Sequence, residues 1–412
     1  MAKSLYICYF GVREPLVQTQ VIPYLRELVK GGHEISLLTF EGQVTELQSC
    51  GVAGLKEELR TQGIDWHWLK YHKRFSVAAT AWDIFWGTVF TWRFIRRERP
   101  DILHGRVHVP TLMGAIARKF SRRKPKLLFD IRGFFPEEYV DAGVWAENDV
   151  IYRTAKRVER WLMRESDGFV VLTEKARSIL FPESRESGFD KSGRPVEVIP
   201  CCVDFGARFS MNGADARESL RKRLGIEERF VITHVGALGG LYLSNELADF
   251  IAAAKAQNPT TYALFLTQSD PDRIVPLLEE RGFCSEDYFV GKVPPTEVPN
   301  YLRASDLSLS FVQATFATQS RSPTKIPEYL AAGLPIIANG GVGDVDELIT
   351  SAGVGVLVDD FTPESYKSAL SLVAQLGDVG QRCCEVARHQ FDLHSVGGER
   401  YRRVYRRLFG ER

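Results

Sequence analysis

Short runs of consecutive apolar residues alternate with stretches of helical spacing along the first half of the chain. Leu5–Phe10 is such a run, and it predicts a strand that is covered on both faces of a parallel sheet. Val17–Lys30 then carries apolar residues on one helical face, and Pro23 either kinks this helix or marks its first turn. Gly31-Gly32 ends the helix and Ile35–Phe40 predicts the next strand, which completes one β-α-β unit.

The same alternation continues and then restarts in the second half. Further strands of the first half are expected at Ile102–His104, Leu127–Ile131 and Gly168–Leu172. The second half opens with Phe230–Val235, a predicted strand that ends at Gly236. We then expect a helix at Asn245–Lys255 and three more strands at Tyr262–Thr267, Leu307–Phe311 and Leu334–Ala338. Alternating β and α elements are typical of a parallel sheet with helices on both faces.

A polar stretch separates the two halves. Val196–Pro200 predicts the last strand of the first half, and polar residues follow it up to about Arg217. We therefore expect an N-terminal domain at 1–205 and a C-terminal domain at 206–390. Residues 391–412 predict a last helix that closes the second domain or packs back on the first. The predicted fold class is α/β, with two Rossmann-like domains facing across a cleft, where ligands lie at the carboxyl ends of the strands.

Composition narrows the class of protein. The chain has 412 residues, more than one core usually organises, and its 44% hydrophobic and 25% charged residues are typical of a soluble globular protein. The net charge is +1, so nothing favours a nucleic acid as partner. The seven cysteines include no C-x-x-C pair and are interpreted as buried thiols of a reducing compartment. The first residues lack the pattern of a secretory signal, so we expect a cytoplasmic protein.

Ser322–Ile337 is the segment richest in candidate chemistry. A loop with Thr324 and Lys325 leads into a short helix with Glu328, and Lys325 and Glu328 are spaced to share a helix face. An ammonium beside a carboxylate suits a nucleotide-sugar, because the cation binds the diphosphate and the carboxylate accepts hydrogen bonds from the ribose hydroxyls. The alternative is a surface ion pair without a function, worth roughly a few tenths of a kcal/mol.

A glycine-rich turn comes directly after the next predicted strand. Asn339–Asp344 reads N-G-G-V-G-D, and Val345–Ile349 predicts the start of a helix. Glycines let backbone amides approach phosphate oxygens, and a helix N-terminus adds free N–H donors and a favourable dipole. The turn is therefore a candidate phosphate site, and an ordinary turn with Asp344 as helix cap is the alternative.

The run S-P-T-K-I-P-E-Y-L-A-A-G-L-P-I-I, followed by G-G-V-G-D, resembles the donor-binding region of family 4 glycosyltransferases. The resemblance covers nearly the whole chain, since further similar segments are the Gly11 loop, Gly32–Glu34, Pro100–His104, Val198–Asp204 and Thr233–Gly236. It implies a retaining glycosyltransferase of the GT-B fold. The nucleotide-sugar is then a co-substrate, and we expect no metal and no other cofactor.

The sequence departs from the family's pattern at two places. The first of the family's two donor-site glutamates falls at Ser320, whereas Glu328 matches the second, which holds the ribose. The family's cations after the second-domain glycine are absent from Gly236–Gly240. The phosphate charge then falls on Lys325, on Arg321 and on the amides of the glycine turn. The donor-binding residues implied are Gly11, Gly236, Arg321, Ser322, Thr324, Lys325, Glu328, Gly341, Val342 and Gly343.

The first domain supplies the candidate acceptor residues. The loop Gly11–Pro15 follows the first strand and should lie at the carboxyl edge of its sheet. We expect Arg13, Gln18 and His104 to bind the acceptor. The alternatives are a tight turn at Gly11, an exposed helix surface at Gln18 and a structural role for His104.

Phe129–Glu138 follows another strand and carries charges, a glycine and aromatic residues. The family frequently has a histidine there that contacts the transferred sugar, and Arg132 or Asp130 stands at its place. The resemblance implies that Arg132 and Asp130 are catalytic, together with Lys325 and Glu328. Arg132 would stabilise charge on the leaving phosphate, and Asp130 would orient an acceptor hydroxyl. The alternative is a buried ion pair between the two residues.

Residues 76–94 are rich in aromatic side chains and have basic residues at their ends. Asp83 interrupts a stretch that is barely long enough to span a bilayer, so we do not predict a transmembrane helix. Such a helix either packs in the core or lies in the headgroup layer at the inner face of the plasma membrane, with added attraction from the basic run at 118–126. In the second case a lipid-linked saccharide is the natural acceptor.

The leading hypothesis is sugar transfer from a UDP- or GDP-sugar to a saccharide or lipid-linked saccharide in cell-surface polysaccharide biosynthesis. One alternative is an epimerase or phosphorylase-like enzyme of the same architecture. The other is a catalytically silent binding subunit, which Ser320 and the missing cations favour. No G-x-G-x-x-G run follows the first strand, which disfavours an NAD enzyme.

Overall fold

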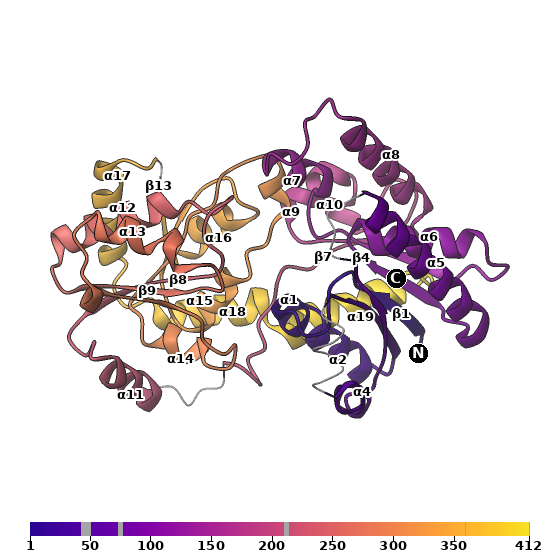
Figure 1. Cartoon of the computed structure of the whole chain (residues 1–412), viewed down its shortest axis with the longest axis horizontal. Helices are drawn as coiled ribbons and strands as arrows, with labels where there is room; N and C mark the ends of the chain where they lie inside the picture. Colours follow the sequence, from indigo (N-terminus) through magenta and orange to yellow (C-terminus); the bar gives the residue numbers. More distant parts are fainter. Residues whose placement is uncertain (43–50, 73–76, 210–213, 359, 412) are drawn as a thin grey trace. The chain divides into compact units, whose positions relative to one another are not determined.

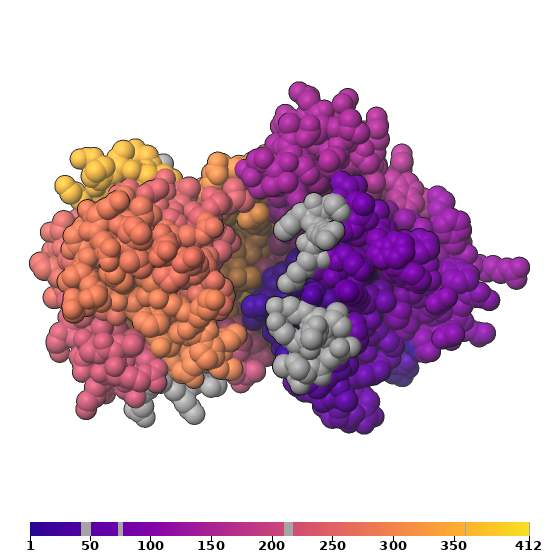
Figure 2. Space-filling model, viewed as in Figure 1, coloured from indigo at the N-terminus to yellow at the C-terminus, as the bar shows by residue number. Residues whose placement is uncertain are grey.

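The computed structural model describes residues 1–42, 51–72, 77–209, 214–358 and 360–411, which form two α/β units (Figure 1). Unit 1 comprises Met1–Pro200 together with Leu393–Arg412, and unit 2 comprises Cys201–Asp392. Side chains fill the space between the ribbon elements within each unit (Figure 2). The predicted class of two parallel-sheet α/β domains is confirmed. Unit 1 ends its first segment at Pro200 rather than at residue 205.

Unit 1 is built on a parallel sheet whose described strands lie in the order β3-β2-β1-β4-β5-β6-β7. Because β1 lies between β2 and β4, the order reverses there, and right-handed connections place helices on both faces. The carboxyl ends beside such a reversal are where open α/β sheets bind ligands. The strands are β1 Lys3–Ile7, β2 Glu34–Glu41, β3 Ile64–Lys70, β4 Ile102–Arg106, β5 Lys126–Asp130, β6 Gly168–Val171 and β7 Val196–Val198.

The helix predicted for Val17–Lys30 is two helices, α1 (Pro15–Gln20) and α2 (Ile22–Lys30). Pro23 stands in the first turn of α2, where its missing N–H removes no hydrogen bond. The aromatic segment forms α5 (Val77–Glu98), and residue 76 of the predicted range lies outside the described residues. The other helices of this segment are α4 Val52–Thr61, α6 His108–Lys119, α7 Phe135–Asp141, α8 Val150–Glu165, α9 Glu174–Leu180 and α10 Ser184–Ser187.

The end of the chain belongs to unit 1 by its contacts. A π-helical turn, η4 (Leu393–Gly398), leads into α19 (Glu399–Arg407), so the regular helix is shorter than the predicted range 391–412. Figure 1 shows this yellow helix beside α2 and β1. Tyr401, Val404 and Tyr405 form the buried face of α19 and hold it on the unit 1 sheet.

Unit 2 contains a second parallel sheet, whose described strands lie in the order β10-β9-β8-β11-β12-β13. The order reverses between β8 and β11, so the carboxyl ends of these two strands form the corresponding ligand edge. Phe230–Val235 is a strand with the predicted bounds. The strands are β8 Phe230–Val235, β9 Thr261–Leu266, β10 Tyr288–Gly291, β11 Leu307–Ser310, β12 Ile336–Asn339 and β13 Gly355–Val358.

Helices cover both faces of the unit 2 sheet, and the burial of its strands shows this directly. Val231 and Leu264 pack in one cluster with α14, α15 and α18, whereas their neighbours Ile232 and Phe265 pack in another with α12, α13 and α17. Successive side chains of a strand point to opposite faces, so both faces are apolar. The helices are α11 Ala214–Leu224, α12 Ser244–Gln257, α13 Val275–Glu279, α14 Val298–Arg303, α15 Lys325–Ala331, α16 Val345–Ala352, α17 Pro363–Gln375 and α18 Gly380–Phe391.

Candidate donor and acceptor sites

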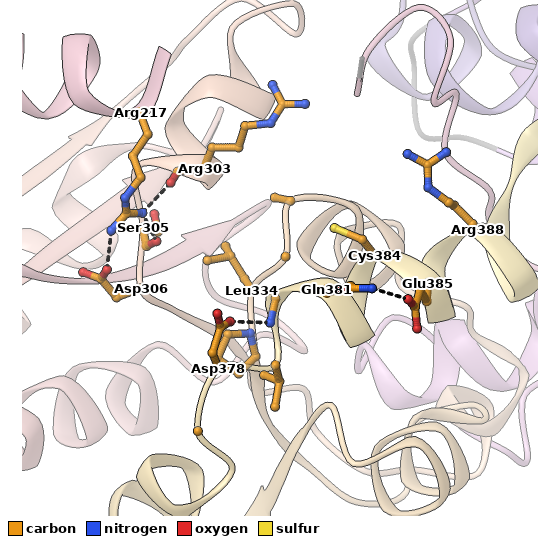
Figure 3. A pocket seen from close by; sticks show the side chains of 16 residues that line it. Arg217, Arg303, Ser305, Asp306, Leu334, Asp378, Gln381, Cys384, Glu385 and Arg388 are labelled. Atoms are coloured by element: carbon orange, nitrogen blue, oxygen red, sulfur yellow. Dashed lines mark hydrogen bonds and ion pairs between the residues drawn. The ribbon is translucent and has the colours of Figure 1, made fainter. Parts of the chain in front are cut away.

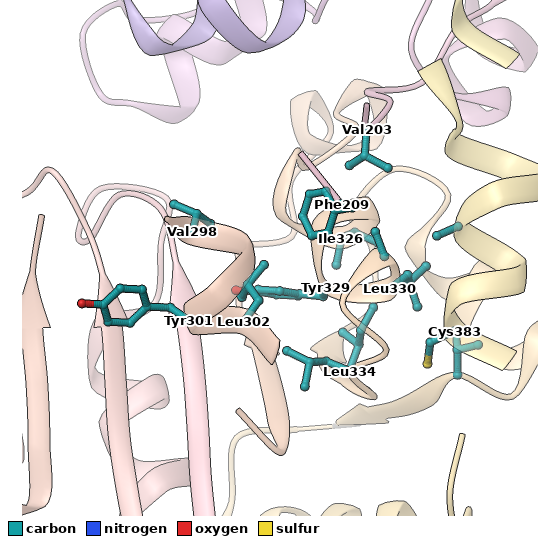
Figure 4. Packing of buried hydrophobic residues seen from close by; sticks show 14 of the residues in the cluster. Val203, Phe209, Val298, Tyr301, Leu302, Ile326, Tyr329, Leu330, Leu334 and Cys383 are labelled. Carbon is teal, nitrogen blue, oxygen red and sulfur yellow. The ribbon is translucent and has the colours of Figure 1, made fainter. Parts of the chain in front are cut away.

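The helix α15 positions the two charged residues that the sequence singled out. Its residues Ile326, Tyr329 and Leu330 point into the buried cluster of unit 2 (Figure 4). The Tyr329 hydroxyl accepts a hydrogen bond from the Val235 amide (2.8 Å) and donates one to the Leu309 carbonyl (3.1 Å). These bonds attach α15 to the carboxyl ends of β8 and β11. Lys325 and Glu328 are therefore held at the ligand edge of the unit 2 sheet.

Lys325 is a buried cation at this edge. Its side chain is only 5% exposed, and Nζ lies 3.4 Å from Nε2 of His234 and 4.7 Å from the ring centroid of Tyr242. A Cβ atom at Gly236, where φ is +127°, would come within 3.3 Å of Nζ, so a glycine is needed at that turn. Burial lowers the pKa of Lys325 to about 7. Among the residues that the structure describes, no carboxylate forms an ion pair with this ammonium.

His234 is the neighbour that sequence reasoning missed. It is fully buried near the end of β8, and Nε2 lies 3.3 Å from the Ala237 carbonyl. Burial, reinforced by the charge of Lys325, holds the pKa of His234 well below its usual range, so the ring is neutral. A neutral ring leaves Lys325 as the charged member of the pair. A buried ammonium without a counter-charge is expensive unless an anionic ligand supplies one.

Glu328 is already ion-paired in this structure. Its Oε1 accepts a hydrogen bond of 2.6 Å from Nη1 of Arg208, and Nη2 of Arg208 donates to the Pro295 carbonyl. The Glu328 side chain is partly accessible, and its second oxygen can accept hydrogen bonds from a ribose diol. Arg208 comes from the polar stretch after the domain boundary, and no local pattern there indicates that it pairs with a residue of α15.

The glycine turn between β12 and α16 is shaped by its own hydrogen bonds. The Gly341 amide donates to Asp346 Oδ1 (3.0 Å), and the Gly343 amide donates to the Thr318 carbonyl (3.0 Å). Val342 is buried, and a Cβ atom at Gly341 would come within 2.8 Å of Ala314. These two amides are therefore engaged within unit 2 and are not free to bind phosphate in this structure. Packing against Ala314 explains the glycine at position 341.

The remaining predicted donor residues surround the start of α15. The Ser322 hydroxyl accepts a hydrogen bond from the Cys201 amide (3.0 Å), so it holds the first residue of unit 2 in place. Thr324 is exposed and Arg321 is half-buried. Ser320, which replaces the family's first glutamate, is buried, and its hydroxyl donates to the Ala317 carbonyl (2.6 Å). Its short side chain points into the protein and offers no contact to a sugar.

No metal-binding arrangement is present among the described side chains of His, Cys, Asp and Glu. Two Asp-x-Asp pairs occur, Asp270-Pro-Asp272 and Asp344-Val-Asp346. One aspartate of each pair stabilises a turn. Asp270 accepts a hydrogen bond from the Asp272 amide (3.2 Å), and Asp346 accepts from the Gly341 amide. Independence of metals stays a prediction.

In unit 1 the predicted acceptor loop is held by a carboxylate that the sequence analysis missed. Glu41 ends β2, is 5% exposed, and accepts hydrogen bonds from the Val12 amide (2.8 Å) and from the Thr39 hydroxyl (2.5 Å). Burial raises the pKa of Glu41. A Cβ atom at Gly11 would lie 2.8 Å from Glu41 Oε2, so Gly11 permits this close approach. Gln18 donates to the Val12 carbonyl (2.6 Å), and Arg13 is exposed.

Asp130 and Arg132 form the buried ion pair that was the alternative to catalytic roles. Arg132 Nε lies 2.8 Å from Asp130 Oδ1, and the Tyr401 hydroxyl donates to Asp130 Oδ2 (2.9 Å) and accepts from Arg132. His104 is fully buried, with Nδ1 3.0 Å from the Tyr405 hydroxyl. Asp130 and His104 have no exposed surface, so the predicted contacts of both with an acceptor are not available in this structure. The role of Arg132 stays a prediction.

The charge of Asp130 is fixed by its neighbours. Burial opposes ionisation, but Arg132, the His104 side chain and Arg106 outweigh it and hold the pKa of Asp130 well below its usual range. The network connects the ends of β4 and β5 to α19, and it explains why the last helix is part of unit 1.

A cavity of about 820 Å³ lies at the opposite, amino-terminal edge of the unit 2 sheet (Figure 3). Arg217 closes one side by its bonds to Asp306 Oδ1 (2.6 Å) and to the Ser305 carbonyl (2.7 Å). None of the predicted donor residues lines this cavity. Since Ser305 and Asp306 precede β11 and Pro335 precedes β12, it is separate from the ligand edge at Lys325.

No described helix has both the length and the apolar character needed to cross a membrane. The aromatic helix α5 nevertheless exposes Trp82 (52%), Phe85 (54%) and Trp86 (42%). Asp83 points the other way and is buried, so it does not interrupt this face. The helix therefore packs in unit 1 through one side and leaves an aromatic side uncovered.

Solved structures of other proteins share this fold. A sucrose-phosphate synthase from Thermosynechococcus elongatus is 16% identical with a TM-score of 0.70, and 99% of each chain is covered. Alr3699/HepE from Anabaena, in complex with UDP and glucose, is 14% identical with a TM-score of 0.69 and complete coverage of both chains. A glycosyltransferase from Rickettsia africae is 14% identical, with a TM-score of 0.69 over 100% of this chain and 99% of its own.

Among curated proteins, spore coat protein SA of Bacillus subtilis is 23% identical over 196 residues. The match spans 45% of this chain and half the length of that relative. Two family models match consecutive parts of the chain. Residues 17–206 match Glycosyltransferase Family 4 and residues 216–390 match Glycosyl transferases group 1. The two matches follow the two units in order, and the chain belongs to the GT-B glycosyltransferases of the family 4 type.

Proposed function

We propose that this glycosyltransferase moves a sugar from a UDP- or GDP-sugar to a hydroxyl of a saccharide or lipid-linked saccharide and retains the anomeric configuration. One observation carries the proposal. Lys325 is a buried ammonium without a carboxylate partner in the described chain, and it lies at the strand-order reversal of unit 2. A diphosphate supplies the missing negative charge in an environment of low dielectric, where charge pairing is strong. Uridine is the favoured base, since Alr3699/HepE was solved with UDP-glucose.

In this proposal, Lys325 and Glu328 contact different parts of the donor. Lys325 binds the diphosphate and stabilises the charge that develops as the sugar–phosphate bond breaks. Glu328 accepts hydrogen bonds from the ribose diol through the oxygen that does not face Arg208. The departing phosphate takes the proton of the acceptor hydroxyl on the face where the new glycosidic bond forms. Positioning and charge stabilisation then replace a protein nucleophile and a protein base.

The exposed face of α5 suits an acceptor at a membrane. Trp82, Phe85 and Trp86 are uncovered, and Phe120, 76% exposed, lies in the basic run at 118–126. Aromatic side chains with cations nearby bind the headgroup region of an anionic bilayer. We therefore propose a cytoplasmic protein that lies peripherally at the inner face of the plasma membrane, with a lipid-linked saccharide of a surface polysaccharide as acceptor.

Thermal stabilisation by a panel of nucleotide-sugars tests the proposal. We expect one nucleotide and its sugar to raise the melting temperature of the wild-type protein, and we expect Lys325→Ala and Glu328→Ala to abolish turnover while the fold stays intact. Lys255→Ala is the matched control, because Lys255 also lies over an aromatic ring (4.3 Å from the Phe283 centroid) but pairs with Asp287.

The same panel separates the alternatives. Conversion of the donor sugar without any acceptor indicates an epimerase, and stabilisation by none of the nucleotides indicates a silent subunit. Proton NMR of the product's anomeric centre tests retention, and an inverted product contradicts that part of the proposal. Wild-type turnover in Lys325→Ala contradicts the donor site.

A further inference from the structure

A buried carboxylate on α5 holds a tyrosine and a histidine at the carboxyl edge of the unit 1 sheet. Asp83 is 1% exposed and faces into the unit. Its Oδ2 accepts hydrogen bonds from the Tyr9 hydroxyl (2.7 Å) and from the His72 amide (3.2 Å). Its Oδ1 lies 2.6 Å from Nδ1 of His72. Three groups from two loops therefore converge on one carboxylate of a helix.

This arrangement fixes the direction of the His72 ring. A carboxylate accepts and does not donate, so Nδ1 carries a proton, and in the neutral ring the lone pair is on Nε2. The His72 side chain is 38% exposed, and among the described residues no group bonds to Nε2. Burial and the bond to Asp83 raise the pKa of Tyr9, so its hydroxyl stays a donor. Nε2 is thus an oriented hydrogen-bond acceptor at the protein surface.

The position of the ring points to a ligand. Tyr9, Glu41 and His72 stand at the carboxyl ends of the adjacent strands β1, β2 and β3. The loop at Gly11, held by Glu41, is at the same edge. Ligands of open α/β sheets bind at this edge, on loops that a rigid scaffold positions.

We propose that His72 binds the acceptor saccharide, with Nε2 accepting a hydrogen bond from one of its hydroxyl groups. Asp83 and Tyr9 are positioning residues, because they set the tautomer and the direction of the ring without touching the ligand. A second-layer carboxylate of this kind is how proteins orient a functional imidazole. The inference rests on the proposed glycosyl transfer and deepens it by naming an acceptor contact that the sequence analysis did not find.

The structure offers a matched control for this histidine. His394 Nδ1 lies 2.7 Å from Oε2 of the buried Glu27, and the His394 side chain is 70% exposed. The two pairs have the same chemistry, but His394 belongs to the turn before α19 and not to the strand edge. His72→Asn and His394→Asn each keep an N–H donor for the carboxylate and remove the Nε2 acceptor. A purely structural role predicts the same small effect for both variants.

The first measurement reads the ring directly. In protein with ¹⁵N-labelled histidine, we expect the His72 signals, identified by their loss in His72→Asn, to show the Nδ1–H tautomer. Titration with the octyl β-glycosides of glucose, galactose and mannose, at concentrations below micelle formation, should shift the Nε2 signal of His72 and leave His394 unchanged. No shift of His72 with any of the three glycosides overturns the inference, whatever the result of the nucleotide panel.

The second measurement separates acceptor from donor. With a stabilising nucleotide-sugar, we expect His72→Asn to raise the KM for the octyl glycoside about tenfold, as for the loss of one hydrogen bond. The KM for the donor and its slow hydrolysis by water should stay unchanged, and His394→Asn should behave as wild type. An unchanged acceptor KM in His72→Asn overturns the inference. Absence of donor binding in wild type instead contradicts the proposed function, and the titration still tests His72.

Discussion

The side-chain nitrogen of Lys325 lies 3.4 Å from Nε2 of His234, and burial drives both groups toward their neutral forms. His234 loses its proton first, because burial and the adjacent ammonium both lower its pKa. Lys325 keeps a pKa of about 7 and is the cation of the pair near neutral pH. A diphosphate that binds there raises this pKa again, because an opposite charge favours the ammonium form. Donor binding and protonation of Lys325 are therefore coupled.

The affinity for a nucleotide-sugar should fall as the pH rises above about 7. Below that pH, Lys325 is protonated in the free protein and binding needs no proton. Above it, Lys325 is neutral in the free protein, so binding takes up one proton and Kd rises up to about tenfold per pH unit. Each phosphate of a UDP-sugar has a single, strongly acidic ionisable oxygen and keeps its charge over this range. Isothermal titration of UDP-glucose from pH 6 to pH 9 measures the slope.

Lys325→Met is the control for this pH dependence. The variant should bind weakly at every pH, and its remaining affinity should be flat between pH 6 and pH 9. Lys255→Met should keep the wild-type profile, since Asp287 pairs with that lysine outside the ligand edge. The same slope in Lys325→Met as in wild type would assign the titration to another group.

Removal of the Lys325 charge should stabilise the protein without ligand. The folded state holds Lys325 at a lowered pKa, so the unfolded chain binds the proton more strongly and stability is reduced below the unfolded pKa of lysine. Lys325→Met keeps the volume and removes this penalty. We expect the free energy of unfolding at pH 7 to rise by on the order of 1–3 kcal/mol. Thermal unfolding without nucleotide tests this, and a lower melting temperature would show that the ammonium stabilises the fold.

The contact between Glu328 and the ribose should depend on the ribose hydroxyls. Glu328→Gln should weaken UDP-glucose binding about tenfold to a hundredfold, because it removes charge-assisted hydrogen bonds to the diol. The 2′,3′-dideoxy analogue should bind wild type and Glu328→Gln equally. Arg208→Met should cause a smaller loss, since it frees the carboxylate from its 2.6 Å ion pair but leaves the charge. Glu347→Gln, on the exposed side of α16, is the control, and an equal loss with both donors would contradict the ribose contact.

Asp130 should stabilise unit 1, and it should do so only above acidic pH. Asp130→Asn leaves the guanidinium of Arg132 buried without its counter-charge, so we expect a loss of about 3–5 kcal/mol at pH 7. The folded pKa of Asp130 is lowered, so this stabilisation is present above the unfolded value of about 3.9 and fades as the pH falls below it.

Urea unfolding at pH 7 and at pH 3 measures the effect of Asp130. The seven tryptophans all lie in residues 66–161, so their fluorescence reports unit 1 alone. The difference between wild type and Asp130→Asn should shrink at the lower pH. Glu57→Gln removes a fully exposed pair with Arg60 and should leave the transition unchanged. A loss that is equal at both pH values would show that the packing of Asp130, and not its charge, stabilises unit 1.

Apolar runs in the sequence predicted the strands that are covered on both faces of a sheet. Phe230–Val235 was predicted with its actual bounds because it is a central strand. The strands that the sequence analysis did not identify, Ile64–Lys70, Tyr288–Gly291 and Gly355–Val358, are at the edges of the two sheets. Asp65 and His67 interrupt the apolar pattern of the partly exposed β3, whereas β10 and β13 are apolar runs of only four residues. Local patterning therefore identified the centre of each sheet better than its borders.

Only those residues of the candidate site that are close together in the sequence could be predicted. Lys325 and Glu328 could be identified because residues at this spacing share one face of a short helix. Their partners come from far along the chain, since Arg208 is 120 residues from Glu328 and His234 is 91 residues from Lys325. The same holds for Glu41, which is 29 residues from Val12 in the Gly11 loop, and for Asp83, which is 74 residues from Tyr9. Only the folded chain brings these groups together.

The exposed aromatic face of α5 should bind anionic membranes. Trp82, Phe85 and Trp86 contact one another with ring centroids 5.4–6.2 Å apart, so they present one apolar surface. The basic run beside Phe120 is partly neutralised, because Arg118 pairs with Asp167 and Lys119 pairs with Glu165. The aromatic rings should therefore supply most of the affinity, and the remaining cations should supply the preference for anionic lipid.

We expect flotation with phosphatidylglycerol vesicles to exceed flotation with phosphatidylcholine vesicles. Serine at all three positions should reduce binding at least about tenfold, through the loss of apolar area alone. Phe316→Ser with Phe361→Ser removes exposed aromatic rings from unit 2 and should leave flotation unchanged. Equal flotation of the triple variant and wild type would mean that α5 covers a protein partner instead, and the acceptor would then not need a lipid.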